Sequence, residues 1–216
     1  MLNFLFLFIV IYTQTLAAAE LEVLAIEYPP YTTRNQSDQG IAFRLLRQYL
    51  ADQPEIRVKP RFLPPARVQL QFSEIRWCGS FYPPPAESGS RFFPLSAEPL
   101  KIGLYHRQDD PHYNWQTLHQ LKGYRVALLR NLQTSVFNEQ FQVAGIRPVF
   151  VDTVIQGMRM LQQKRVDAAL GDEHLQAFLS DQWRRDLPFR FSTTALITTP
   201  IGIHLNPQCP LSRFFR

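Results

Sequence analysis

Cysteine is scarce in this chain of 216 residues, where only Cys78 and Cys209 are present. The five histidines do not cluster with them, so we expect no structural zinc site, no other metal and no cofactor. In an oxidising compartment the two cysteines form either one disulfide, joining the middle of the chain to its end, or two separately buried thiols. The sequence leaves both arrangements open.

Clustered positive charge is missing as well, although the formal net charge is +5. The basic residues are scattered, and no dense basic run carries interleaved aromatic residues, which argues against nucleic acid as a partner. The charge supports only a mild preference for anionic solutes or for the anionic cell envelope. His106 and His174 are isolated and no carboxylate–His–Ser order occurs, so neither histidine is assigned a catalytic role.

Long apolar runs are confined to the N-terminus. Residues 2–12 are almost all apolar, and Ala17, Ala18 and Ala19 follow with the small side chains of a cleavage site. About 11 apolar residues are too few to span a bilayer. Residues 1–19 are therefore predicted to be a signal peptide cleaved near Ala19, the alternative being a buried N-terminal helix. We expect an exported, periplasmic protein.

Alternating strand and helix patterns fill the rest of the chain. In the first half we predict strands over residues 21–26, 56–63, 75–81 and 100–106, and helices over 40–50 and 66–72. In the second half we predict strands over 124–129, 147–151, 166–170 and 188–191, helices over 133–144, 153–164 and 173–180, and an extended segment over 195–205. Each β-α-β series predicts a parallel sheet with helices on its faces.

The two similar halves predict a two-lobed α/β protein whose lobes are joined by two extended crossings. We expect lobe 1 over residues 20–104, lobe 2 over 105–192, and a return crossing with the end of lobe 1 over 193–216. Such an architecture captures ligands at the carboxyl ends of its strands, in the cleft between the lobes.

Several short motifs occur in a consistent order. They are Tyr28-Pro29-Pro30-Tyr31 followed by Gly40, Leu63-Pro64-Pro65-Ala66-Arg67, Trp77-Cys78-Gly79, Leu95-Ser96, Leu121-Lys122-Gly123 and Val166-Asp167-Ala168. In this order they resemble the type II periplasmic binding proteins, specifically the bacterial extracellular solute-binding family 3. The resemblance covers residues 20–205. It implies a monomeric solute-binding protein for an amino acid or a related small carboxylate or amine, with an inner-membrane permease or a sensor as partner.

Two departures from the family pattern stand out. The family's carboxylate-clamping arginine falls at Gly89, and Arg91 lies two residues later. Family members also continue into a longer C-terminal helix where this sequence ends at Arg216. A disulfide between Cys78 and Cys209 would partly replace the packing of that helix.

Seven residues are candidates for ligand contacts, each with a structural alternative. Tyr31 is an aromatic platform or a surface residue of a proline turn. Arg67 and Arg91 are anion ligands or surface arginines. Asp172 accepts hydrogen bonds from a ligand ammonium group or caps a helix.

The remaining candidates are Thr134, Ser135 and Trp77. Thr134 and Ser135 hold an anion at a helix start or simply cap that helix. Trp77 faces the cleft or belongs to the core. We expect a binding protein and not an enzyme. The alternatives are a cyclohexadienyl dehydratase-like enzyme that uses Asp172 or Glu173 as an acid, and a non-binding interaction module.

Overall fold

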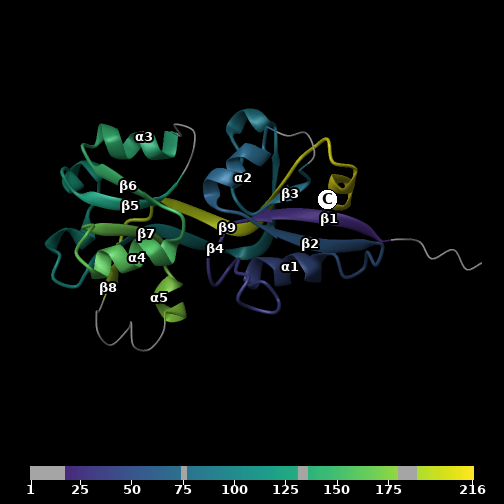
Figure 1. The fold of residues 1–216 in the computed structure, drawn as a ribbon, viewed down its shortest axis with the longest axis horizontal. Coiled ribbons are helices and arrows are strands. Elements are labelled where there is room, and N and C mark those ends of the chain that lie inside the picture. The colour runs from purple at the N-terminus through teal and green to yellow at the C-terminus, as the bar shows by residue number, and fades with distance from the viewer. Residues whose placement is uncertain (1–17, 74–76, 131–135, 180–188) are drawn as a thin grey trace, which may run out of the picture.

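The computed structural model describes residues 18–73, 77–130, 136–179 and 189–216. Most of the predicted signal peptide lies outside these ranges, whereas Ala19 already belongs to the first strand. Within them, no helix combines the length and apolarity needed to cross a membrane. The chain forms two lobes lying side by side, joined by two long strands (Figure 1). This confirms the predicted two-lobed α/β fold.

Lobe 1 is built on strand β1 (Ala19–Ala25), which pairs in parallel with β2 (Ile56–Phe62) and β3 (Gly79–Ser80). Helices α1 (Ile41–Tyr49) and α2 (Pro65–Gln71) connect these strands. The apolar positions of β1 and α1 meet in a buried cluster that includes Leu21, Val23, Phe43 and Leu46. The alternating apolar residues of β1 and the apolar stripe of α1 are therefore buried against each other.

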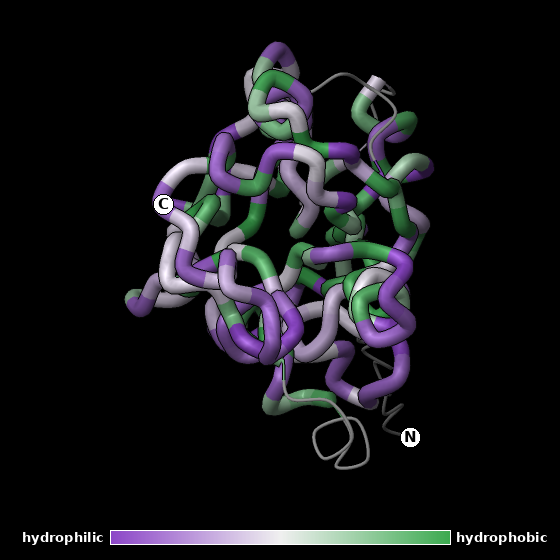
Figure 2. Tube along the Cα trace, turned by 90° about the vertical axis from the view of Figure 1, so that its left-hand side faces the viewer, coloured by the Kyte–Doolittle hydropathy of each residue, from purple (hydrophilic) through white to green (hydrophobic). Residues whose placement is uncertain are grey.

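Lobe 2 repeats this plan with parallel strands β5 (Arg125–Leu129), β6 (Arg147–Val151) and β7 (Ala168–Asp172). Its helices are α3 (Val136–Val143), α4 (Val154–Gln162) and the short α5 (Leu175–Phe178). Buried residues form a core on each side of this sheet. Seen from the lobe 2 end of the molecule, most hydrophilic segments lie on the outside (Figure 2).

Strands β4 (Arg91–Arg107) and β9 (Ile197–Leu205) run antiparallel through both lobes. They place the described strands in one sheet of order β2-β1-β3-β9-β4-β7-β5-β6, and β8 (Phe189–Phe191) pairs with β4. Their pairing breaks between Pro94 and Pro99. Proline has no backbone N–H to donate to the strand pairing, so these two prolines explain the interruption at the crossing.

Four predicted elements need correction. The strand predicted over residues 75–81 is described as a strand only at Gly79–Ser80. The strand predicted over residues 100–106 begins earlier, at Arg91. The strand predicted over 166–170 lies at Ala168–Asp172, so Asp172 ends a strand and does not follow one. The helix predicted over 173–180 is described only as α5. The predicted lobe boundary at residues 104 and 105 falls inside β4.

The C-terminal segment packs on lobe 1. A disulfide joins Cys78 to Cys209, and the 3₁₀ turn Pro210–Phe214 follows directly. Phe215 is fully buried in the lobe 1 core and stacks on Tyr49 with ring centroids 5.4 Å apart. The disulfide and this aromatic contact hold the end of the chain against the first lobe.

Candidate functional site

The turn after β1 is fixed in place by the start of α1. The amide of Ile41 donates to the carbonyl of Pro30, and that of Ala42 to the carbonyl of Tyr31, at 3.1 and 2.9 Å. Gly40 adopts φ 97°, and a Cβ there would stand 2.6 Å from the Tyr31 carbonyl oxygen. The sequence therefore needs glycine at this position, and the contact holds Tyr31 at the carboxyl end of β1.

Asp172 ends β7 and meets Tyr31 across the two lobes. Its side chain is 0% exposed, and Oδ1 accepts hydrogen bonds from the Tyr31 hydroxyl at 3.2 Å and from the His174 amide at 2.9 Å. The Tyr105 hydroxyl donates to the backbone carbonyl of Asp172 at 2.7 Å. The carboxyl ends of strands from both lobes thus meet here, where α/β proteins commonly bind ligands.

Two buried oxygens at this junction lack a hydrogen-bond partner among the described residues. They are Asp172 Oδ2 and the hydroxyl of Tyr28. Buried polar atoms in folded proteins are nearly always bonded, so each unsatisfied one calls for an explanation. We refer to Tyr28, Tyr31, Tyr105, Asp172 and Glu173 together as the interlobe site.

The electrostatics of the interlobe site favour a positive ligand group. Burial raises the pKa of Asp172, although hydrogen bonds from His174 and Tyr31 act in the opposite direction. Burial and the nearby Asp172 charge raise the pKa of Tyr31 and of Tyr28. These phenols therefore stay neutral. Asp172 makes no ion pair with any described residue, and the charge of the neighbouring His174 acts to lower its pKa.

Arg91 makes its described hydrogen bonds away from Tyr31 and Asp172. Its guanidinium donates to the backbone carbonyls of Ser212 and Phe215, at 3.2 and 2.5 Å. Arg91 therefore ties the beginning of β4 to the C-terminal segment. In the pairing of β4 with β9, Arg91 stands opposite Leu205.

The other predicted residues are distributed around the fold. Trp77 is buried and packs edge-on against Phe72, so it belongs to the lobe 1 core. Arg67 lies exposed on the first turn of α2, with no hydrogen bond or ion pair to a described residue. Thr134 and Ser135 lie outside the described residues. Of the candidates, the structure brings Tyr31 and Asp172 together.

Sequence reasoning missed three members of the interlobe site. Tyr28 packs against the cores of both lobes, and its hydroxyl is one of the two oxygens without a partner among the described residues. Tyr105 lies in a strand that the sequence predicts, but the sequence pattern did not show on which face of the strand its side chain lies. The sequence suggested Glu173 only as the acid of the dehydratase alternative. In the structure, its side chain accepts a hydrogen bond from the backbone amide of Lys101 at 2.9 Å. The position of Tyr28 at a strand end was the signal available for it.

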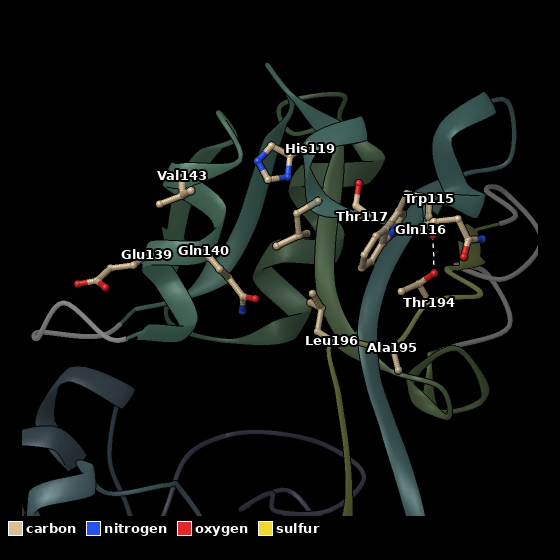
Figure 3. Close-up of a pocket in the computed structure, with 11 residues that line it drawn as sticks. Trp115, Gln116, Thr117, His119, Glu139, Gln140, Val143, Thr194, Ala195 and Leu196 are labelled. Atoms are coloured by element: carbon tan, nitrogen blue, oxygen red, sulfur yellow. Dashed lines mark hydrogen bonds between the residues drawn. The ribbon is translucent and has the colours of Figure 1, made fainter.

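Two cavities lie elsewhere in the described structure. The larger, about 580 Å³, is on lobe 2, between residues 115–119, α3 and the return crossing at 194–196 (Figure 3). Thr194 donates there to the Trp115 carbonyl. The smaller, about 440 Å³, lies beside Arg91 and Cys209. Neither is lined by Tyr31 or Asp172, and the described residues contain no cluster of metal-ligating side chains.

No family model matches the chain, and no curated protein does. Solved structures do match. The GluR0 ligand-binding core from Nostoc punctiforme in complex with L-glutamate superposes with TM-score 0.69 and 18% identity, covering 90% of this chain and 89% of that one. Holo ArgBP from T. maritima gives 0.68 and 19%, covering 91% and 87%.

A third similar structure is a putative L-cystine ABC transporter protein from Listeria monocytogenes, with TM-score 0.68 and 11% identity over 91% of this chain and 86% of that one. These similarities extend over nearly the full length of both chains. The chain therefore has the fold of the type II periplasmic binding proteins, as its motifs indicate.

Proposed function

We propose that this protein binds a small polar solute, an amino acid or a related small carboxylate or amine, between its two lobes. The observation that carries the proposal is the fully buried carboxylate of Asp172, which meets Tyr31 of the other lobe and keeps one oxygen without a partner. An ammonium group of a solute is the natural donor to such an oxygen. Fold neighbours whose titles name glutamate, arginine and cystine support the same class of ligand.

The sequence also supports a proposal for where the protein acts. Residues 1–19 direct export to the periplasm, residues 20–104 and 105–192 form the two lobes, and residues 193–216 return to lobe 1. Ligand binding holds the lobes together, and an inner-membrane permease or sensor reads the bound form of the monomer. The dehydratase alternative requires an acid beside an anion clamp. Asp172 meets the first requirement, but no described cation is paired with it, so we favour binding.

A thermal-shift panel on the mature protein tests this function. The panel contains amino acids, amines, dicarboxylates and small sugars. A ligand at about 100 times its Kd adds roughly 2.7 kcal/mol to the free energy of unfolding, which produces a clear rise in Tm. A rise for one class, lost in Asp172→Asn and retained in Asp109→Asn, supports the proposal. Asp109 is an exposed carboxylate in the same lobe, so it is a matched control. A flat panel contradicts the proposal.

A further inference from the structure

The interlobe site contains unbonded acceptors and neutral aromatic rings but no described cation. Resting on the proposed function, we propose that its ligand is an organic amine without an α-carboxylate, a cationic alkylamine or diamine and not a zwitterionic amino acid.

The two unpartnered oxygens fit one ammonium group. Asp172 Oδ2 and the Tyr28 hydroxyl are both buried, and they are not bonded to each other. Tyr31 and Tyr105 both donate hydrogen bonds to Asp172, and the Tyr28 ring lies beside that of Tyr31, with centroids 6.3 Å apart. An ammonium group carries three N–H donors and no acceptor, which matches two acceptors among aromatic rings.

A second carboxylate adds to the negative character of the site. Glu173 follows Asp172 directly, acts electrostatically on Tyr31 and Tyr105, and makes no ion pair with a described residue. A zwitterion would bring its own carboxylate toward these two charges. Like charges at short range without a countercharge are unfavourable, whereas a diamine offers a second cation for Glu173.

Of three described arginines that could clamp a ligand carboxylate, two are bonded elsewhere. Arg91 is bonded to the carbonyls of Ser212 and Phe215. Arg130, at the carboxyl end of β5, pairs with Asp152 through Nε and Oδ1 at 3.1 Å. Arg67 is exposed and makes no hydrogen bond or ion pair with a described residue. It is therefore the one arginine of these three that can bind a ligand without losing an existing hydrogen bond or ion pair. The test therefore includes Arg67.

Matched ligand pairs isolate the α-carboxylate. Calorimetric titration of the mature wild-type protein compares cadaverine with lysine and agmatine with arginine, each pair differing in that group alone. We expect the amine of at least one pair to bind about tenfold or more tightly than its amino acid. An amino acid that binds as well as or better than its amine overturns the inference, and leaves the proposed function intact. Failure of all four ligands together with a flat panel removes both.

Two variants locate the effect. We expect Asp172→Asn to weaken amine binding about 10- to 100-fold, because it removes the charge at the acceptor. Tyr28→Phe removes only the unpartnered hydroxyl, and we expect a loss of about 3- to 10-fold. The control is Tyr49→Phe, which deletes a hydroxyl bonded to the Phe214 carbonyl within lobe 1. Equal effects of Tyr28→Phe and Tyr49→Phe contradict the assignment.

Arg67→Ala provides the opposing test. On our assignment, this change leaves the amine affinity and the preference within each ligand pair unchanged. If it selectively weakens lysine or arginine and has no effect on cadaverine or agmatine, Arg67 is a carboxylate clamp and the inference is wrong. Thermal unfolding of each variant without ligand confirms that the compared proteins are folded.

Discussion

Oδ1 of Asp172 accepts two hydrogen bonds, whereas Oδ2 has no partner among the described residues. The side chain is fully buried. A buried ionised group that lacks a countercharge destabilises the folded state. Ligand-binding residues often have this property, because the group that satisfies them arrives with the ligand. On the proposed function, Asp172 favours binding at the expense of the stability of the unliganded protein.

Asp172→Asn should raise the stability of the unliganded protein at pH 7 while weakening amine binding. We expect a gain of about 1 kcal/mol, or about 2–4 °C in Tm for a chain of this size. Because burial raises the pKa of Asp172 above 3.8, the protonated form stabilises the fold below pH 3.8, and this contribution is lost as pH rises through the folded-state pKa. The gain should therefore shrink toward pH 4. A lower Tm of the variant at pH 7 would contradict this account.

His106 gives a second pH dependence at the residue scale. Its imidazole is fully buried, and Nδ1 lies 2.8 Å from Asp110 Oδ2. Burial lowers the pKa of His106 from 6.5, and this outweighs the neighbouring carboxylate, which acts to raise it. The unfolded chain then takes up a proton more readily, so stability is complete above pH 6.5 and is lost as pH falls through the folded-state pKa.

His106→Asn keeps a side-chain donor near Asp110 but cannot titrate. We expect Tm to fall less between pH 7 and pH 5 in this variant than in the wild type. His112→Asn is the control, because His112 is a half-exposed neighbour of the same carboxylate. Thermal unfolding across the pH range measures both slopes, and equal slopes for wild type and His106→Asn refute the assignment.

At the scale of elements, the C-terminal segment depends on lobe 1 for its position. It is held by the disulfide to Cys78, by burial of Phe215 and by the two hydrogen bonds from Arg91. These contacts lie away from Tyr31 and Asp172. Arg91 therefore stabilises the fold through the C-terminal segment.

Arg91→Ala should lower stability and leave ligand affinity unchanged. The guanidinium is exposed, so we expect about 1 kcal/mol, or about 2–4 °C in Tm. Thermal unfolding and calorimetric titration with the tightest ligand of the panel measure the two effects on the same preparation. Arg91→Lys keeps the charge without the planar fork and should restore only part of the loss. An affinity loss at unchanged Tm would restore the ligand-clamp interpretation.

The elements differ in how far the sequence could predict them. Strand β6 was predicted at its observed bounds, and α1 and β2 within a residue or two, because each has a clear periodic pattern. The first half of β4 was missed, since its pairing comes from β9, more than a hundred residues later. The same limit applies to the site. Tyr31 and Asp172 were each identified at a strand end, but their contact joins residues 141 positions apart and depends on how the lobes pack.

At the scale of the whole molecule, two strands connect the lobes, and the hydrogen bond from Tyr31 to Asp172 joins them at the interlobe site. The pairing of β4 with β9 is interrupted between Pro94 and Pro99, which leaves a short segment free of ladder bonds at the crossing. Closure of two-lobed proteins relies on a few such residues that absorb the backbone rotation. The Tyr31–Asp172 bond then favours the arrangement in which the lobes touch.

Tyr31→Phe should shift the unliganded protein toward a more open arrangement. Loss of a hydrogen bond with a net value of about 1 kcal/mol changes the ratio of open to closed molecules about fivefold. We expect a larger radius of gyration in small-angle scattering and faster amide exchange around Asp172, both restored toward wild type by a saturating amine. Tyr49→Phe, the same chemical change inside lobe 1, should alter neither. If Tyr31→Phe leaves both measurements unchanged, the hydrogen bond does not hold the lobes together, and closure must come from the ligand alone.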